Sequence, residues 1–161
     1  MSTLPNILII TTHDSGQHFG CYGVPTVQTP AIDQLAAEGV CFDRMFAASP
    51  ICSPSRGALL TGRYPLANGL VGLTGRHWNW ELNDYQQHLS HRLRAAGYHT
   101  AMFGLQHETK YIDRLGFDDA SAHGIKDQDG NDISAPRVAD KVAAFLKSRG
   151  NDANPFYAQV G

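Results

Sequence analysis

The chain has 161 residues, which is enough for a compact domain with a buried core. With 42% hydrophobic and 17% charged residues, the composition is typical of a globular protein. The net charge is −2 and there is no basic run, so we expect no nucleic-acid partner. No apolar run is long enough to span a bilayer, and no membrane partner is expected. The N-terminus has no signal-peptide pattern. We therefore expect a cytoplasmic protein, or a periplasmic or secreted one whose leader was removed.

The first elements predict an α/β arrangement. Residues 6–11 form an apolar, β-branched run that predicts a buried parallel strand. His13 and Asp14 follow at its carboxyl end, where open α/β sheets bind ligands. A threonine and a proline then predict a helix over residues 30–38. Residues 40–46 predict a second strand.

Ser53 and Pro54 repeat the same start signal, which predicts a helix with Ser53 as its N-cap. The alternation of strands and helices along the chain predicts an α/β fold, with a mostly parallel sheet and helices on both faces. The chain stops inside its last predicted strand, which suggests a fragment of a longer protein. The remaining expected segments are a loop over 68–75, a helix over 84–96, a strand over 100–103, irregular chain over 105–132, a helix over 134–149 and a strand over 156–160.

Cys52 lies just before this second helix start. Free backbone N–H groups and the helix dipole favour an anion at such a position. Arg56, one turn into the helix, adds a fixed positive charge that suits sulfate or phosphate. A buried structural cysteine beside a surface arginine would explain the same two residues. Position alone leaves both interpretations open.

The spacing Cys52-x-Pro54-x-Arg56 resembles the signature of type I sulfatases, which belong to the alkaline-phosphatase-like superfamily. The resemblance covers nearly the whole chain, and residues 68–73 are most similar to the heparan N-sulfatase (N-sulfoglucosamine sulfohydrolase) branch. The other similar segments are residues 5–10, 20–23, 29–36, 60–63 and 93–100.

The resemblance implies an alkaline-phosphatase-like fold and a covalent mechanism. In this family the cysteine, here Cys52, is converted to formylglycine by a formylglycine-generating enzyme. The hydrated aldehyde then attacks the sulfur of a small sulfated substrate or a sulfated glycan. Arg56 would stabilise the charge at the nucleophile. Because family members are well over twice this length, residues 1–161 would be the N-terminal part of a single, truncated catalytic domain.

The family usually carries an Asp-Asp pair after the first strand, which together with the modified cysteine binds a divalent metal, as a rule Ca²⁺. Here the pair is His13-Asp14, so the resemblance implies Asp14, His13 and Cys52 as metal ligands. His13 offers nitrogen where calcium prefers oxygen. Either His13 is a substituted ligand for a softer metal or it only lines the site.

A second departure lies at residues 104–108. The family has Gly-Lys-x-His there, so His107 matches the catalytic histidine, whereas Leu105 replaces the lysine and cannot bind sulfate. Glu108, next to His107, would orient the imidazole or bind metal.

Two other functions remain open. A phosphonate monoester or phosphodiester hydrolase of the same superfamily would share the fold, the metal and the modified cysteine. A degenerate member without activity would bind only anions or a partner.

Overall fold

The computed structural model describes residues 4–75, 78–123, 135–150 and 154–161. The chain forms two compact units. The first comprises Met1–Thr11 with Ala48–Gly161, and the second comprises Thr12–Ala47.

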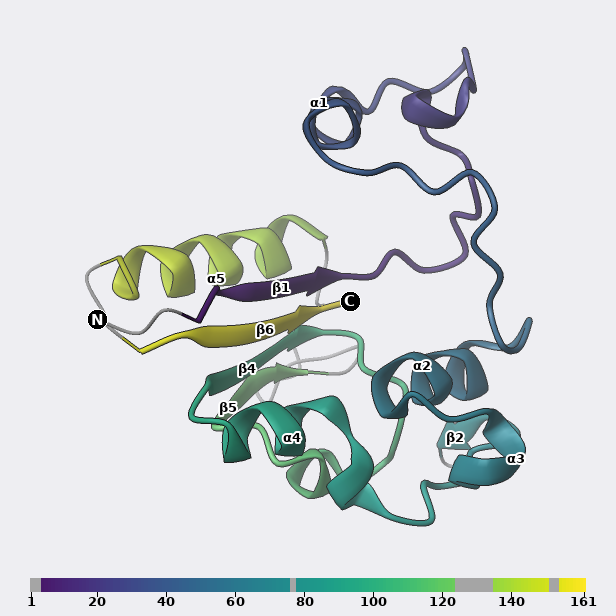
Figure 1. Cartoon of the computed structure of the whole chain (residues 1–161), viewed down its shortest axis with the longest axis vertical. Coiled ribbons are helices and arrows are strands. Elements are labelled where there is room, and N and C mark those ends of the chain that lie inside the picture. The colour runs from purple at the N-terminus through teal and green to yellow at the C-terminus, as the bar shows by residue number, and fades with distance from the viewer. Residues whose placement is uncertain (1–3, 76–77, 124–134, 151–153) are drawn as a thin grey trace. The chain divides into compact units, whose positions relative to one another are not determined.

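A four-stranded parallel sheet lies at the centre of the first unit (Figure 1). Its order is β1-β6-β4-β5, and every neighbouring pair is parallel. Parallel strands bring their carboxyl ends to one edge of the sheet, so the segments that follow them lie close together. The predicted parallel sheet is thereby confirmed, but the first strand is not fully buried as expected, because Leu8 is 42% and Ile10 64% exposed. The strands are β1 (Ile7–Ile10), β4 (His99–Gly104), β5 (Asp119–His123) and β6 (Phe156–Val160).

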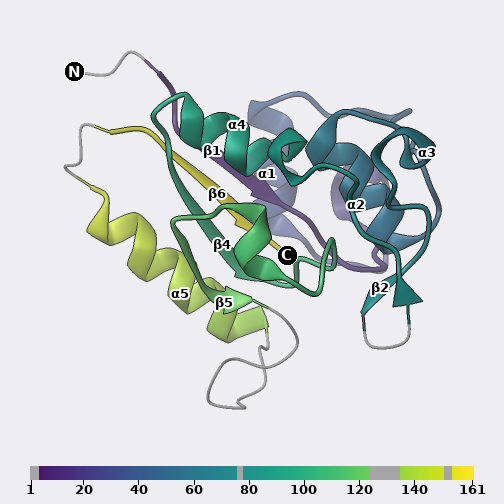
Figure 2. The same ribbon diagram turned by 90° about the horizontal axis from the view of Figure 1, so that it is seen from below.

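Helices cover both faces of this sheet, as the second view shows (Figure 2). Helix α5 (Ala135–Ser148) packs on one face, where Phe145 contacts the rings of Phe103 and Phe156. Helix α4 (Leu89–Ala95) covers the other face. Burial of these apolar side chains is the main stabilising contribution to such a layered domain.

The first unit also contains shorter helices and a second, two-stranded sheet. Its other elements are α2 (Cys52–Thr61), α3 (Pro65–Asn68), the antiparallel pair β2 (Thr74–Gly75) and β3 (Trp78–Asn79), and the short 3₁₀ helices η2 (Tyr85–Gln87) and η3 (Ile112–Leu115).

The second unit contains η1 (Gly20–Tyr22) and α1 (Pro30–Glu38). Helix α1 confirms the prediction for residues 30–38. The hydroxyl of Thr29 donates to the Asp33 carboxylate over 2.9 Å and accepts from the N–H of Gly20 over 2.8 Å, and it caps no N–H group of the helix. The strand predicted over residues 40–46 is wrong, because none of the described strands pairs with this segment and its apolar side chains are exposed.

Two other expectations change. The helix predicted over 84–96 is two shorter helices, because the backbone of His88 is extended and its Nδ1 accepts from the N–H of Ser90. The chain expected to be irregular over 105–132 contains η3 and β5, and its end lies outside the described residues. No helix among the described residues has the length and apolarity needed to cross a membrane.

Candidate active site

Cys52 is the first residue of α2, and Ile51 rather than Ser53 is the N-cap. The backbone of Ile51 is extended, and its carbonyl accepts from the N–H of Ser55 over 3.0 Å, which starts the helix. The Ser53 hydroxyl instead accepts from the N–H of Thr74 over 3.3 Å. The predicted capping role of Ser53 is therefore wrong. The prediction that Cys52 stands at a helix start is confirmed.

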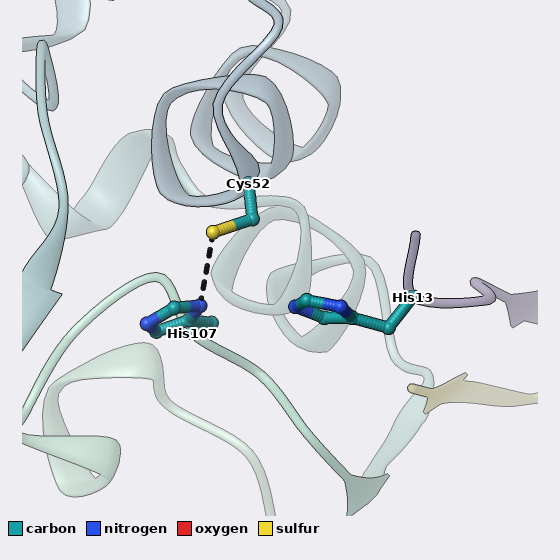
Figure 3. A group of neighbouring side chains, drawn as sticks. All are labelled: His13, Cys52 and His107. Carbon is teal, nitrogen blue, oxygen red and sulfur yellow. Dashed lines mark hydrogen bonds between the residues drawn. The ribbon is translucent and has the colours of Figure 1, made fainter. Parts of the chain in front are cut away.

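His107 lies opposite this cysteine. The Sγ of Cys52 and the Nδ1 of His107 are 3.2 Å apart, within hydrogen-bonding distance for sulfur (Figure 3). The two residues are 55 positions apart in the sequence, so the contact is made by the fold rather than by local structure. It brings together two of the residues predicted to act in catalysis.

The loop after β4 fixes the place of His107. Its backbone has a φ of 53°, an uncommon left-handed conformation for a residue with a side chain. The Gln106 side chain stabilises this turn, because its Oε1 accepts from the N–H groups of Glu108 (2.6 Å) and Thr109 (3.1 Å). Sequence reasoning missed Gln106, which is mostly buried and shows its role only once the loop is folded.

Gly104 allows the sheet to approach this loop. Its φ is 78°, and a Cβ there would lie 2.0 Å from the carbonyl oxygen of Gly161. Any side chain at this position would therefore separate β4 from the end of β6 or shift the loop that carries His107.

Arg56 lies one turn after Cys52 and is only 7% exposed. Its Nη1 donates to the Thr11 hydroxyl over 2.9 Å and to the Leu105 carbonyl over 3.1 Å. The guanidinium is thus held where β1 and β4 end. Leu105 supplies no cation in place of the family's lysine, but its carbonyl oxygen binds the arginine.

The side chain of Glu108 is buried. Its carboxyl group is fully buried and accepts from the Nε2 of Gln159 over 3.2 and 3.3 Å. Burial raises the pKa of Glu108 to about 8, while the nearby Arg56 and the Gln159 hydrogen bond act in the opposite direction. The group is therefore mostly protonated near neutral pH. This favours a structural role over the metal-ligand role considered from the sequence.

His88 lies beside this carboxyl group and is also fully buried. Its Nε2 is 3.9 Å from Glu108 Oε2. Burial lowers the pKa of His88 to about 3, so the contact joins two neutral groups rather than an ion pair.

His13 and Asp14 belong to the second unit. The Nδ1 of His13 is 3.1 Å from Asp14 Oδ2, and the Asp14 side chain is 87% exposed. Asp14 adopts a φ of 56°. The carboxylate offers the oxygen that hard cations prefer, and the imidazole offers nitrogen that softer ones accept. These donors fit a divalent metal without selecting calcium. That Cys52 is a further ligand of this metal stays a prediction.

Known proteins resemble this chain along most of its length. The family model described as Sulfatase matches residues 5–161. N-acetylgalactosamine-6-sulfatase of Homo sapiens is 39% identical over 112 residues, which are 64% of this chain and 22% of that protein. The chain thus spans about a fifth of the length of this curated relative. The finer resemblance to the heparan N-sulfatase branch stays a prediction.

Two solved structures share the fold. One, in complex with its substrate D-glucosamine-2-N,6-O-disulfate, has a TM-score of 0.72 and 29% identity over 96% of this chain and 33% of that one. The phosphonate monoester hydrolase of Agrobacterium radiobacter has a TM-score of 0.68 and 21% identity over 98% of this chain and 40% of that one. The parallel sheet is thus that of the alkaline-phosphatase-like sulfatases, and the family match shows that this chain belongs to the sulfatase family.

Proposed function

We propose that residues 1–161 are the N-terminal part of the catalytic domain of a sulfatase that hydrolyses a sulfate ester or sulfamate. One observation carries the proposal: Cys52 begins a helix, its Sγ lies 3.2 Å from His107 Nδ1, and Arg56 follows one turn later. A nucleophile, a proton-exchanging group and a fixed cation are the parts that such a hydrolysis requires.

Cys52 is the proposed precursor of formylglycine, made by a formylglycine-generating enzyme. The Sγ atom stands in for the oxygens that the hydrated aldehyde would carry on the same Cβ. That hydrate supplies the nucleophilic oxygen. An ordinary structural cysteine would need neither a histidine within 3.2 Å nor a place at a helix N-terminus.

His107 and Arg56 have separate roles in this proposal. The Nδ1 of His107 faces the group on Cys52 and is placed to take up or return its proton. Arg56 supplies a positive charge, and its burial strengthens its interaction with a sulfate group. Together with the N-terminus of α2, it favours the negative charge that develops on the sulfuryl oxygens.

The proposal includes a divalent metal at Asp14, with His13 as a second donor. Metal binding at this pair would replace the 3.1 Å contact between the two side chains. The family resemblance favours Ca²⁺, whereas the nitrogen donor favours a softer ion. Chelation followed by addition of Ca²⁺, Mn²⁺ or Zn²⁺ decides between them: the ion that restores turnover at the lowest concentration is the working metal.

A sulfated sugar is the proposed substrate class. The support is the 29% identical solved structure described with D-glucosamine-2-N,6-O-disulfate and the 39% identity to N-acetylgalactosamine-6-sulfatase. Both names describe substrates that carry sulfate on an amino sugar.

The test uses the full reading frame that contains these residues, co-expressed with a formylglycine-generating enzyme. Aryl sulfate, aryl phosphonate and a phosphate diester are assayed in parallel. We expect the highest kcat/KM for the sulfate, and its loss in Cys52→Ala. Cys41→Ala is the matched control, because Cys41 is an exposed free thiol in the second unit.

Two outcomes would contradict the proposal. A preference for the phosphorus substrates would identify a phosphonate or phosphodiester hydrolase. Sulfate binding without turnover of any ester would identify a member that only binds anions.

A further inference from the structure

The guanidinium of Arg56 is held in a socket at the carboxyl edge of the sheet. Its Nη1 has two acceptors, the hydroxyl of Thr11 at 2.9 Å and the carbonyl of Leu105 at 3.1 Å. Gly161 closes the socket, since a Cβ on it would lie 2.9 Å from Nη1. The segments that follow three neighbouring strands, β1, β4 and β6, therefore meet at one nitrogen atom.

Thr11 is an unusual member of this socket. It follows directly on the apolar residues of β1, at a position where a valine would continue the pattern equally well. Its hydroxyl donates to the Val160 carbonyl over 3.2 Å, and its backbone N–H donates to the same oxygen over 2.8 Å. Because a hydroxyl has a single hydrogen, this bond leaves only lone pairs to face Arg56.

This arrangement has a directional consequence. A guanidinium is planar, so two acceptors on one nitrogen fix the rotation of the whole group. Among the described residues, the hydrogen bonds of Arg56 all run from Nη1. The edge formed by Nη2 and Nε is thus left to meet an anion in a bidentate way.

We propose that Thr11 is a positioning residue of this site: its hydroxyl sets the orientation in which Arg56 meets the sulfate group. The inference rests on the proposed function for the identity of the anion. It assigns to Thr11 a role that is not attributable to β-sheet formation, because valine would form the strand without binding Arg56.

The test measures binding of inorganic sulfate by calorimetry, which requires no turnover. Thr11→Val and Thr11→Ala remove the hydroxyl, and Thr11→Ser keeps it. We expect roughly tenfold to a hundredfold weaker sulfate binding in the first two, the loss typical of one hydrogen bond to a charged group. Thr11→Ser should bind within about threefold of the wild type, a margin well below that loss.

Thr100→Val is the matched control for a purely structural effect. Thr100 is a buried threonine near the opposite end of β4, and its hydroxyl bonds the Asp118 carboxylate over 3.0 Å. This variant should have a lower melting temperature and unchanged sulfate affinity.

The outcomes separate the inference from the proposed function. Unchanged sulfate affinity in Thr11→Val and Thr11→Ala would overturn the inference, as would an equal loss in Thr11→Ser or a wild type that binds no sulfate. A wild type that binds sulfate through Thr11 but hydrolyses no sulfate ester would overturn the proposed function alone.

Discussion

Replacing Glu108 with glutamine tests the buried carboxyl group behind the site. The substitution keeps the shape of the side chain and an oxygen that can accept from Gln159. It removes the ability to ionise. Any difference in stability between the variant and the wild type that changes with pH therefore belongs to the titration of Glu108.

The magnitude follows from the pKa of Glu108, which burial raises from 4.5 to about 8. Between these values the folded protein keeps a proton that the unfolded chain has lost, so the free energy of unfolding falls as pH rises. The slope is about 1.4 kcal/mol per pH unit, which gives a cost of roughly 3 kcal/mol near pH 7.

His88 acts in the opposite direction. Burial lowers the pKa of His88 to about 3, so the unfolded chain binds a proton below pH 6.5 that the folded protein excludes. Its contribution is lost as pH falls from 6.5. Because His88 is present in both proteins, this term cancels when Glu108→Gln is compared with the wild type.

The assay is urea denaturation of both proteins between pH 4.5 and pH 8. Relative to the wild type, Glu108→Gln should gain stability steadily with pH, by roughly 3 kcal/mol near pH 7 compared with pH 4.5. Glu38→Gln is the control, because Glu38 is an exposed glutamate on α1. A difference between Glu108→Gln and the wild type that stays constant with pH would refute the reasoning.

Three further substitutions test the fold and the site. Gly104→Ala should lower the free energy of unfolding by about 1–3 kcal/mol, because φ is 78° and the new Cβ would meet a carbonyl oxygen. Gly150→Ala is its control in the same denaturation assay. It should change the free energy of unfolding little, because the nearest atom to its Cβ would be 3.4 Å away. Phe103→Ala should cost about 3–5 kcal/mol in the core under α5, and Phe46→Ala, 88% exposed, should cost almost nothing; equal losses would contradict the assigned core. His107→Ala should lower kcat about 10²–10⁴-fold with an unchanged melting temperature; full activity would remove it from the site.

The parallel sheet could be predicted because its strands are continuous apolar runs, such as residues 6–11, followed by turn residues. The strand predicted over 40–46 shows where that signal fails. Its residues are apolar enough for a strand, but Phe42 and Phe46 remain exposed, and no strand in the described part of the chain pairs with them. Hydrophobicity predicts an element only when a partner is available to cover it. Strand β5 was missed for the opposite reason, since its composition is small and polar.

The candidate site was only partly predictable. The resemblance to sulfatases implied Cys52, Arg56 and His107, and the structure brings the first and third into contact. The acceptors of Arg56 could not be foreseen, because Thr11 is 45 positions away and the Leu105 carbonyl is a backbone atom. Such contacts depend on strand order and register, which no local pattern reports.

Mass spectrometry of the peptide that contains Cys52 tests the central claim most directly. The full reading frame is expressed with and without a formylglycine-generating enzyme, and sulfate release is measured on the same samples. We predict the mass of formylglycine at position 52 only in the first sample, with turnover in proportion to conversion. An unmodified thiol in both samples together with undiminished sulfate release would contradict the account.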